Sequence, residues 1–152
     1  MTRYISILLL CVSAFINIAH AAEKRVAIIA DAKMHLGPEL ALILAQRDHD
    51  IVLMDPRDGL VAELEKLGAK VIVVDGIKSI NDKGAVQKLV DAADKNFGGF
   101  DSAFIRPGLH LTGTILEATE EDFQRGYEGN MLSTARALQA LLPDLIAKER
   151  KG

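Results

Sequence analysis

Apolar residues along the chain gather in short continuous runs that alternate with longer stretches in which they recur three or four positions apart. The short runs are apolar on both sides, which is typical of strands buried inside a parallel sheet. They predict strands at residues 25–30, 51–54, 70–74 and 100–105. The stretches of helical spacing predict helices at residues 38–50, 58–67, 81–97 and 119–148.

Strands that alternate with helices of this length form β-α-β units, in which successive strands lie parallel. Because such crossovers are right-handed, the simplest arrangement is a doubly wound parallel α/β sheet. Capping residues mark three of the helix ends. Asn81 and Thr119 are placed to cap helix starts, the latter with acidic Asp122 at the third helical position, and Gly68 is placed to cap an end.

The first 21 residues form a separate segment. Arg3 precedes an apolar run over residues 5–18, and Ala19-His20-Ala21 then supplies small residues at the two positions that signal peptidase reads. This order is that of a secretory signal peptide, so we expect cleavage after Ala21 and an exported protein, periplasmic or secreted. The run is shorter than the roughly 20 apolar residues of a membrane-spanning helix. An uncleaved membrane anchor and a buried N-terminal helix stay open as alternatives.

The composition narrows the function classes. The chain is 49% hydrophobic and 26% charged, so residues 22–152 can bury a core as one domain. Lys and Arg number 18 against 21 Asp and Glu, and this net charge of −3 gives no electrostatic footprint for nucleic acid. Cys11 is the single cysteine, which excludes an intramolecular disulfide and a thiolate metal cluster. The four histidines lack metal-ligand spacing, so no metal site is expected.

Chemistry-bearing residues follow each predicted strand. The turn after the first strand, residues 30–37, reads ADAKMHLG. Asp55 follows the second strand, Asp75 follows the third, and residues 104–108 after the fourth read FIRPG. The stretch that follows at residues 113–143 reads GTILEATEEDFQRGYEGNMLSTARALQALLP and includes most of the helix predicted from Thr119.

Together these segments, from Arg25 to Pro143, resemble the first part of a short-chain dehydrogenase/reductase. The resemblance implies a Rossmann-like doubly wound parallel sheet that binds NAD or NADP across its first β-α turn, truncated here to about four strands. The function that it implies is that of an NAD(P)-dependent oxidoreductase.

In that family the first turn reads T-G-x-x-x-G-x-G, and its glycines give a tight turn, a close approach of backbone to pyrophosphate and close helix packing. Gly37 is the glycine that remains, and the resemblance implies that it lines the cofactor together with Leu36. Asp31 and His35 stand where the first two glycines would be. Their Cβ atoms would crowd the pyrophosphate and the Asp31 carboxylate would repel it. The helix N-terminus at Gly37 can still attract an anion, and Lys33 adds positive charge, so the site is degenerate.

Two carboxylates are candidates for the adenosine half of the cofactor. Asp55 stands near the offset expected of the acidic residue that binds the ribose 2′-hydroxyl, which would favour NAD over NADP. In the resembled family an aspartate at the position of Asp75 contacts the adenine. As alternatives, Asp55 initiates a turn before Pro56 and Asp75 is a solvated residue at a strand end. The alternative that the chain binds no cofactor therefore stays open.

Residues 104–108 stand where the family has V-N-N-A-G. Ile105 and Arg106 replace the two asparagines that steady the central sheet, and Gly108 remains as a cofactor-binding position. Asn130 falls on the asparagine of the family's catalytic tetrad, where that residue bends the helix and holds a water. A helical Asn130 that faces solvent is the alternative.

The family's chemistry also needs a serine and a Tyr-x-x-x-Lys pair, in which the tyrosine transfers the proton and the lysine lowers its pKa and holds the ribose. The tyrosines here are Tyr4 and Tyr127, and Met131 stands four residues after the latter. We therefore expect no complete active site in this chain.

Two functions remain. The first is an oxidoreductase-like protein with a degenerate dinucleotide-binding half. The second is a non-catalytic exported scaffold that self-associates, because an open sheet edge follows the fourth strand and the helix at 120–148 carries an apolar stripe. That stripe consists of Met131, Ala135, Leu138, Leu142 and Leu145. In the resembled family the corresponding helix commonly packs against a second subunit, so we expect a homo-oligomer. Retention of residues 1–21 would tether either form to a membrane.

Overall fold

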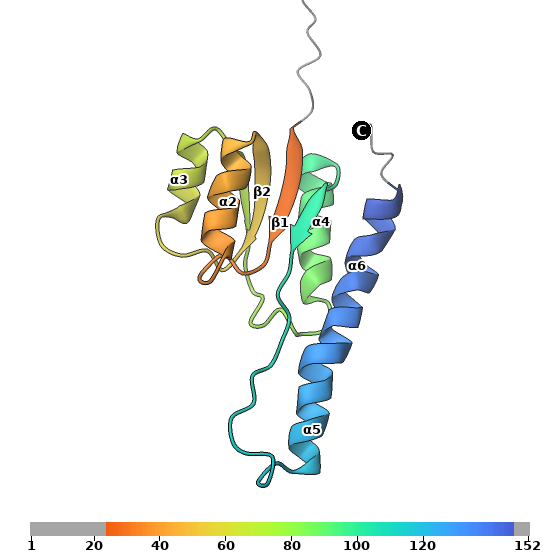
Figure 1. Ribbon diagram of the computed structural model, residues 1–152. Coiled ribbons are helices and arrows are strands. Elements are labelled where there is room, and N and C mark those ends of the chain that lie inside the picture. The colour runs from red at the N-terminus through yellow and green to blue at the C-terminus, as the bar shows by residue number, and fades with distance from the viewer. Residues whose placement is uncertain (1–23, 148–152) are drawn as a thin grey trace, which may run out of the picture.

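The computed structural model describes residues 24–147, and these form a four-stranded parallel sheet between two layers of helices (Figure 1). The strand order is β3-β2-β1-β4, and every neighbouring pair is parallel. The strands are β1 (Arg25–Ile29), β2 (His49–Met54), β3 (Val71–Val74) and β4 (Ser102–Phe104). The predicted doubly wound sheet of about four strands is confirmed. The signal segment at residues 1–21 lies outside the described residues.

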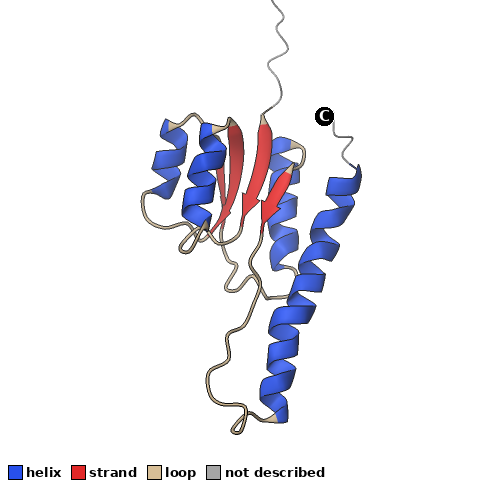
Figure 2. Ribbon diagram, in the orientation of Figure 1, coloured by secondary structure: helices blue, strands red, loops and turns tan. Residues whose placement is uncertain are grey.

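Helices cover both faces of the sheet (Figure 2). The helices α2 (Gly37–Gln46) and α3 (Leu60–Lys66) lie on one face. On the other face lie α4 (Ala85–Phe97) and α6 (Ser133–Ala147). A further helix, α5 (Glu120–Tyr127), continues through the π turn η1 (Glu128–Leu132) into α6 and projects beyond the carboxyl ends of the strands. In the described part of the chain no helix combines the length and the apolar character that a membrane crossing requires.

Alternate side chains of β1 enter the two halves of the core, as the period of two in a strand requires. Val26 and Ile28 pack in the cluster that includes Leu89 and Phe100, on the side of α4 and α6. Ala27 and Ile29 pack in the opposite cluster, on the side of α2 and α3. Because both faces of the sheet are buried, the strand is apolar throughout, which is why a continuous apolar run was the correct signal for it.

Two of the three predicted caps are confirmed. Thr119 and Asp122 form a reciprocal capping box at the start of α5. Gly68, with φ of 87°, follows α3 in the left-handed conformation that glycine tolerates. The predicted cap at Asn81 is wrong, since α4 begins at Ala85 after Gly84. Asn81 is unable to cap it because its side chain is bonded to the backbone of Gly108.

The helical stretch predicted over residues 119–148 is interrupted at η1, at the position where the resemblance implied that Asn130 bends the helix. At η1 the amide of Ser133 bonds to the carbonyl of Glu128, an i to i−5 pattern that takes one extra residue into the turn. Side chains bond to three carbonyls around it. Asn130 Nδ2 donates to the Gly126 oxygen, the Ser133 hydroxyl to Gly129 and the Thr134 hydroxyl to Asn130. Asn130 also bonds to Leu109 outside the helix, a contact that helical spacing alone does not reveal.

Candidate dinucleotide site

The predicted cofactor-binding residues follow the carboxyl ends of all four strands. Leu36 and Gly37 come after β1, Asp55 after β2, Asp75 after β3 and Gly108 after β4. Because the strands are parallel, these ends share one edge of the sheet. In open α/β sheets, ligands bind in the crevice outside this edge. The structure therefore brings the predicted residues to one edge, although nothing in it assigns their roles.

The first turn keeps the backbone of a glycine-rich turn at two positions. Gly37 is buried, and a Cβ there would overlap the carbonyl oxygen of Asp31. His35 adopts φ of 57°, the left-handed region that favours glycine, at one of the positions where the resembled pattern has that residue. Leu36, with 69% of its surface exposed, is the N-cap residue of α2. The turn therefore keeps a glycine-like backbone at these two positions in spite of its side chains.

Two residues that depart from the resembled pattern contact each other. Nε of Arg106, in the loop after β4, donates to Oδ2 of Asp31 at 2.8 Å. The Asp31 side chain is 16% exposed and that of Arg106 is 56% exposed. The carboxylate expected to repel a pyrophosphate is therefore paired with a cation. Sequence reasoning missed Arg106 as a site residue; the available signal was the replacement of two neutral positions by opposite charges.

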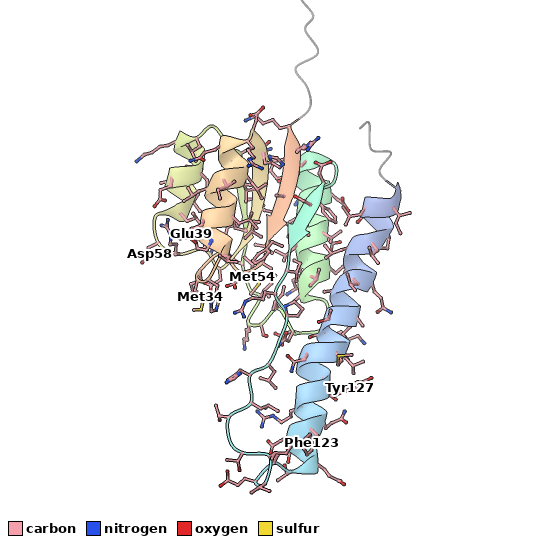
Figure 3. The ribbon with its side chains drawn as sticks, in the orientation of Figure 1. Met34, Glu39, Met54, Asp58, Phe123 and Tyr127 are labelled. Carbon is pink, nitrogen blue, oxygen red and sulfur yellow. The ribbon has the colours of Figure 1, made fainter. Side chains whose placement is uncertain are left out.

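A second ion pair at the carboxyl edge joins the first turn to the residue that follows β2. Nζ of Lys33 lies 3.4 Å from Oδ2 of Asp55, and both side chains are more than half exposed. Asp55 has φ of 45°, so its backbone forms the turn that the alternative interpretation expected. Met34 of the first turn and Met54 at the end of β2 lie on the same side of the molecule (Figure 3). Asp75 is exposed directly beyond β3.

The loop after β2 is bonded to the first turn. The amide of Arg57 donates to the carbonyl of Ala32 at 3.0 Å. Its guanidinium makes two hydrogen bonds of 2.8 Å to the carboxylate of Glu63 in α3. These bonds favour the ionised acid, so they hold the pKa of Glu63 below its usual value. The turn is therefore connected to α3 through this loop.

Two asparagines hold the loop that follows β4. Asn81 donates from Nδ2 to the Gly108 oxygen at 2.8 Å and accepts the Gly108 amide at 2.9 Å. Asn130, in η1, makes the same reciprocal pair with Leu109, at 3.1 and 3.0 Å. Asn130 is helical and exposed, as the alternative expected, and its side chain also holds this loop. Its tetrad-like role stays a prediction.

A separate cavity of about 270 Å³ lies between the first turn of α4 and the facing side of α6. Its lining includes Asn81, Lys83 and Arg136, but no cofactor-binding residue predicted above. Within residues 24–147 no three His, Cys, Asp or Glu side chains come together as metal ligands. The carboxyl edge therefore remains the candidate site.

The family model for short chain dehydrogenase matches residues 25–152. This chain belongs to the short-chain dehydrogenase family. A diacetyl reductase ((S)-acetoin forming) from Staphylococcus epidermidis is 31% identical over 131 residues, which are 85% of this chain and 51% of that protein. The recognised resemblance and the Rossmann-like fold are thus confirmed.

Solved structures of short-chain dehydrogenases agree with this assignment. A family member from Sinorhizobium meliloti superposes with a TM-score of 0.69 at 27% identity, covering 85% of this chain and 58% of that one. L-sorbose reductase from Gluconobacter frateurii, in complex with NADPH and L-sorbose, superposes with a TM-score of 0.66 at 25% identity, covering 82% and 49%. The chain spans about half the length of the relatives that it matches.

Proposed function

We propose that this chain is the dinucleotide-binding part of an NAD(P)-dependent oxidoreductase of the short-chain dehydrogenase family. The observation that carries the proposal is the first turn, in which Gly37 packs against the Asp31 carbonyl and His35 takes a glycine-like backbone conformation. In this proposal the turn brings the N-terminus of α2 to the carboxyl edge, where a pyrophosphate would bind.

The residues present fit such a cofactor. The first turn would take the pyrophosphate, because α2 begins there and no side-chain cap competes for the amides at its start. Asp55 would accept hydrogen bonds from the adenosine ribose and Asp75 would lie near the adenine. Gly108 would let the other half of the cofactor approach the backbone after β4.

Asp55 favours NAD over NADP in this proposal. A carboxylate accepts bonds from the ribose 2′-hydroxyl and repels a 2′-phosphate. Lys33 acts in the opposite direction, and its contact with Asp55 at 3.4 Å reduces its availability to a phosphate. Titration of the purified chain with NADH and NADPH tests this point. We expect NADH to bind more tightly than NADPH. Asp55→Ala is expected to weaken the binding of NADH and to leave Lys33 free to contact the 2′-phosphate of NADPH. Equal affinities that Asp55→Ala leaves unchanged would contradict the assignment.

The chain is proposed to bind the dinucleotide without catalysing hydride transfer. The cofactor itself supplies the hydride chemistry, and the protein must add a proton donor. Neither tyrosine of the sequence is followed by lysine four positions later, and Asn130 is the one residue at a tetrad-like position. With NADH and a panel of small carbonyl compounds, the expected result is saturable binding with no loss of absorbance at the nicotinamide band. Steady turnover by the pure chain would refute this part.

A second candidate function is that of a scaffold that self-associates. Its support is a series of exposed apolar side chains on α5, η1 and α6, of which Phe123 and Tyr127 are labelled in Figure 3. The series consists of Phe123, Tyr127, Met131, Ala135, Leu138, Leu142 and Ile146. Leu145 of the expected stripe is instead half-buried against the core. Such a length of uncovered apolar surface favours association with a second copy.

Sedimentation velocity over a range of concentrations tests the scaffold. The chain is expected to dimerise, and Leu142→Glu is expected to shift it to monomer. Leu67→Glu is the matched control, because Leu67 is exposed to a similar extent, 41% against 44%, but lies at the end of α3. A monomer at all concentrations, or equal effects of both variants, would refute the scaffold.

Export is part of the proposal. The pattern of residues 1–21 supports a cleaved signal peptide, and β1 begins at Arg25, shortly after the expected cleavage point. The intact mass of the protein recovered from its host distinguishes the forms. A mass that matches residues 22–152 would support export, and retention of residues 1–21 would support the membrane-anchored alternative.

A further inference from the structure

The Asp31–Arg106 ion pair lies within the proposed dinucleotide site. Asp31 lies in the loop between β1 and α2, and Arg106 follows β4, the neighbour of β1 in the sheet. The two residues are 75 positions apart in the chain, yet Nε and Oδ2 are 2.8 Å apart. The pair therefore joins two loops that would both contact a dinucleotide.

The geometry of the pair leaves most of the guanidinium available. Arginine has five N–H donors in a planar fork, and Asp31 receives the one on Nε. Within residues 24–147 the four Nη hydrogens make no hydrogen bond to protein, and the side chain is 56% exposed. The bond to Asp31 restricts the rotation of the side chain, so the free edge of the fork is held in place.

We propose, resting on the proposed function, that Arg106 is the residue that allows this first turn to accept a pyrophosphate. It neutralises the Asp31 carboxylate and presents its Nη hydrogens to the phosphate oxygens. Bidentate contact of this kind is the usual mode by which arginine binds phosphate. Asp31 acts as the positioning residue for Arg106. The pair thus compensates for the replacement of a glycine by an aspartate at the turn.

The electrostatic consequence has a definite sign. Removal of Arg106 alone leaves an unpaired carboxylate beside a bound dianion, and we expect the dinucleotide to bind about tenfold more weakly. Removal of both charges eliminates the repulsion together with the attraction. We therefore expect the double variant to regain most of the affinity lost by the single one. A pair that served only the fold would show the same loss and recovery in the unfolding midpoint, so thermal unfolding distinguishes the two roles.

A double-mutant cycle on the full chain tests the proposal, with NADH affinity measured by calorimetry and thermal unfolding recorded for each protein. The variants are Arg106→Ala, Asp31→Asn and the two combined. Asp48→Asn is the matched control, because it removes the negative charge from the 2.9 Å ion pair with Lys24 at the opposite edge of the sheet. The expected result is a roughly tenfold loss for Arg106→Ala, recovery in the double variant and no change for the control. If Arg106→Ala does not fold, Arg106→Gln takes its place in the same cycle.

The outcomes separate this proposal from the one on which it rests. Binding by the wild type that Arg106→Ala leaves unchanged, or a double variant as weak as Arg106→Ala, would overturn the role of Arg106 and leave the dinucleotide site intact. Tighter binding by Arg106→Ala would also overturn it, because the pair would then block the site. No binding by any folded variant would overturn the dinucleotide site, and the role of Arg106 with it.

Discussion

The side-chain amide of Asn130 pairs with both backbone groups of Leu109. Nδ2 donates to the Leu109 oxygen at 3.1 Å, and Oδ1 accepts the Leu109 amide at 3.0 Å. The same Nδ2 donates to the carbonyl of Gly126 within the helix at 2.9 Å. Asn130 therefore joins the π turn to the loop that follows β4. Whatever its part in chemistry, it positions a loop of the proposed site.

Asn130→Ala is expected to lower the free energy of unfolding by about 1–2 kcal/mol, because it removes three hydrogen bonds in a solvent-accessible position. Asn96→Ala is the control, since it removes one bond to the Ala92 carbonyl at the end of α4, and we expect a loss of about 0.5 kcal/mol. Urea unfolding measures both. Equal losses would show that the contact with Leu109 contributes nothing.

The loop that follows β4 packs closely on two helical glycines, Gly126 and Gly129, and predicts different effects of an alanine at each. A Cβ on Gly129 would overlap Cβ of Leu109, whereas one on Gly126 would lie 3.2 Å from the mobile Cδ1 of Leu111. Gly129→Ala should therefore destabilise the protein by about 1–3 kcal/mol in spite of the better helix propensity of alanine. Gly126→Ala should be close to neutral. Thermal unfolding distinguishes them, and the reverse order would contradict the described loop position.

Gly37→Ala should affect both stability and the site. The added Cβ would overlap the backbone oxygen of Asp31, which cannot rotate away as a side chain can. We expect a loss of about 1–3 kcal/mol in unfolding free energy and loss of NADH binding, because the turn must move. Pro38→Ala, at the adjacent position in α2, is the control for helix start and should retain binding. Normal NADH affinity in folded Gly37→Ala would argue against the turn as the pyrophosphate site.

The capping box of α5 predicts an acid-sensitive helix start. The amide and the hydroxyl of Thr119 donate to Oδ2 of Asp122, at 3.0 and 2.8 Å. These bonds favour the charged acid and lower the pKa of Asp122. A lowered folded-state pKa means that the contribution is complete above the ordinary carboxyl pKa and is lost as pH falls through the lowered value.

The difference in unfolding midpoint between the wild type and Asp122→Asn isolates this effect from other carboxylates. We expect the wild type to be more stable than Asp122→Asn at neutral pH. This difference in midpoint should shrink progressively as the pH falls below about 4. A difference that does not change with pH would show that the charge of Asp122 is not involved.

The sequence predicted the sheet better than the helices. The apolar runs of β1 and β2 are buried on both faces of the sheet, and those of the edge strands β3 and β4 are half-buried, so each run marked its strand. The start of α4 was placed too early because Asn81, a good cap by type, is engaged by Gly108 instead. The resemblance placed a bend at Asn130, but helical spacing did not reveal the π turn, because the side chain of Asn130 bonds to a loop distant in sequence. Both errors arise from tertiary contacts that local patterns do not contain.

The candidate site was predicted position by position and not as a set of contacts. Strand ends placed Gly37, Asp55, Asp75 and Gly108 at the edge where the structure has them. The damage expected from Asp31 was judged from that residue alone. Its partner Arg106 is adjacent only because β4 pairs with β1, so the compensation could be seen only once the strand order was known.

The central claim is that the carboxyl edge takes a nicotinamide dinucleotide, and a calorimetric titration of the purified, folded chain with NADH tests it most directly. The account predicts saturable binding at one site per chain. A folded protein that shows no heat of binding up to millimolar NADH would contradict it, and the Rossmann-like frame would then serve only as a scaffold.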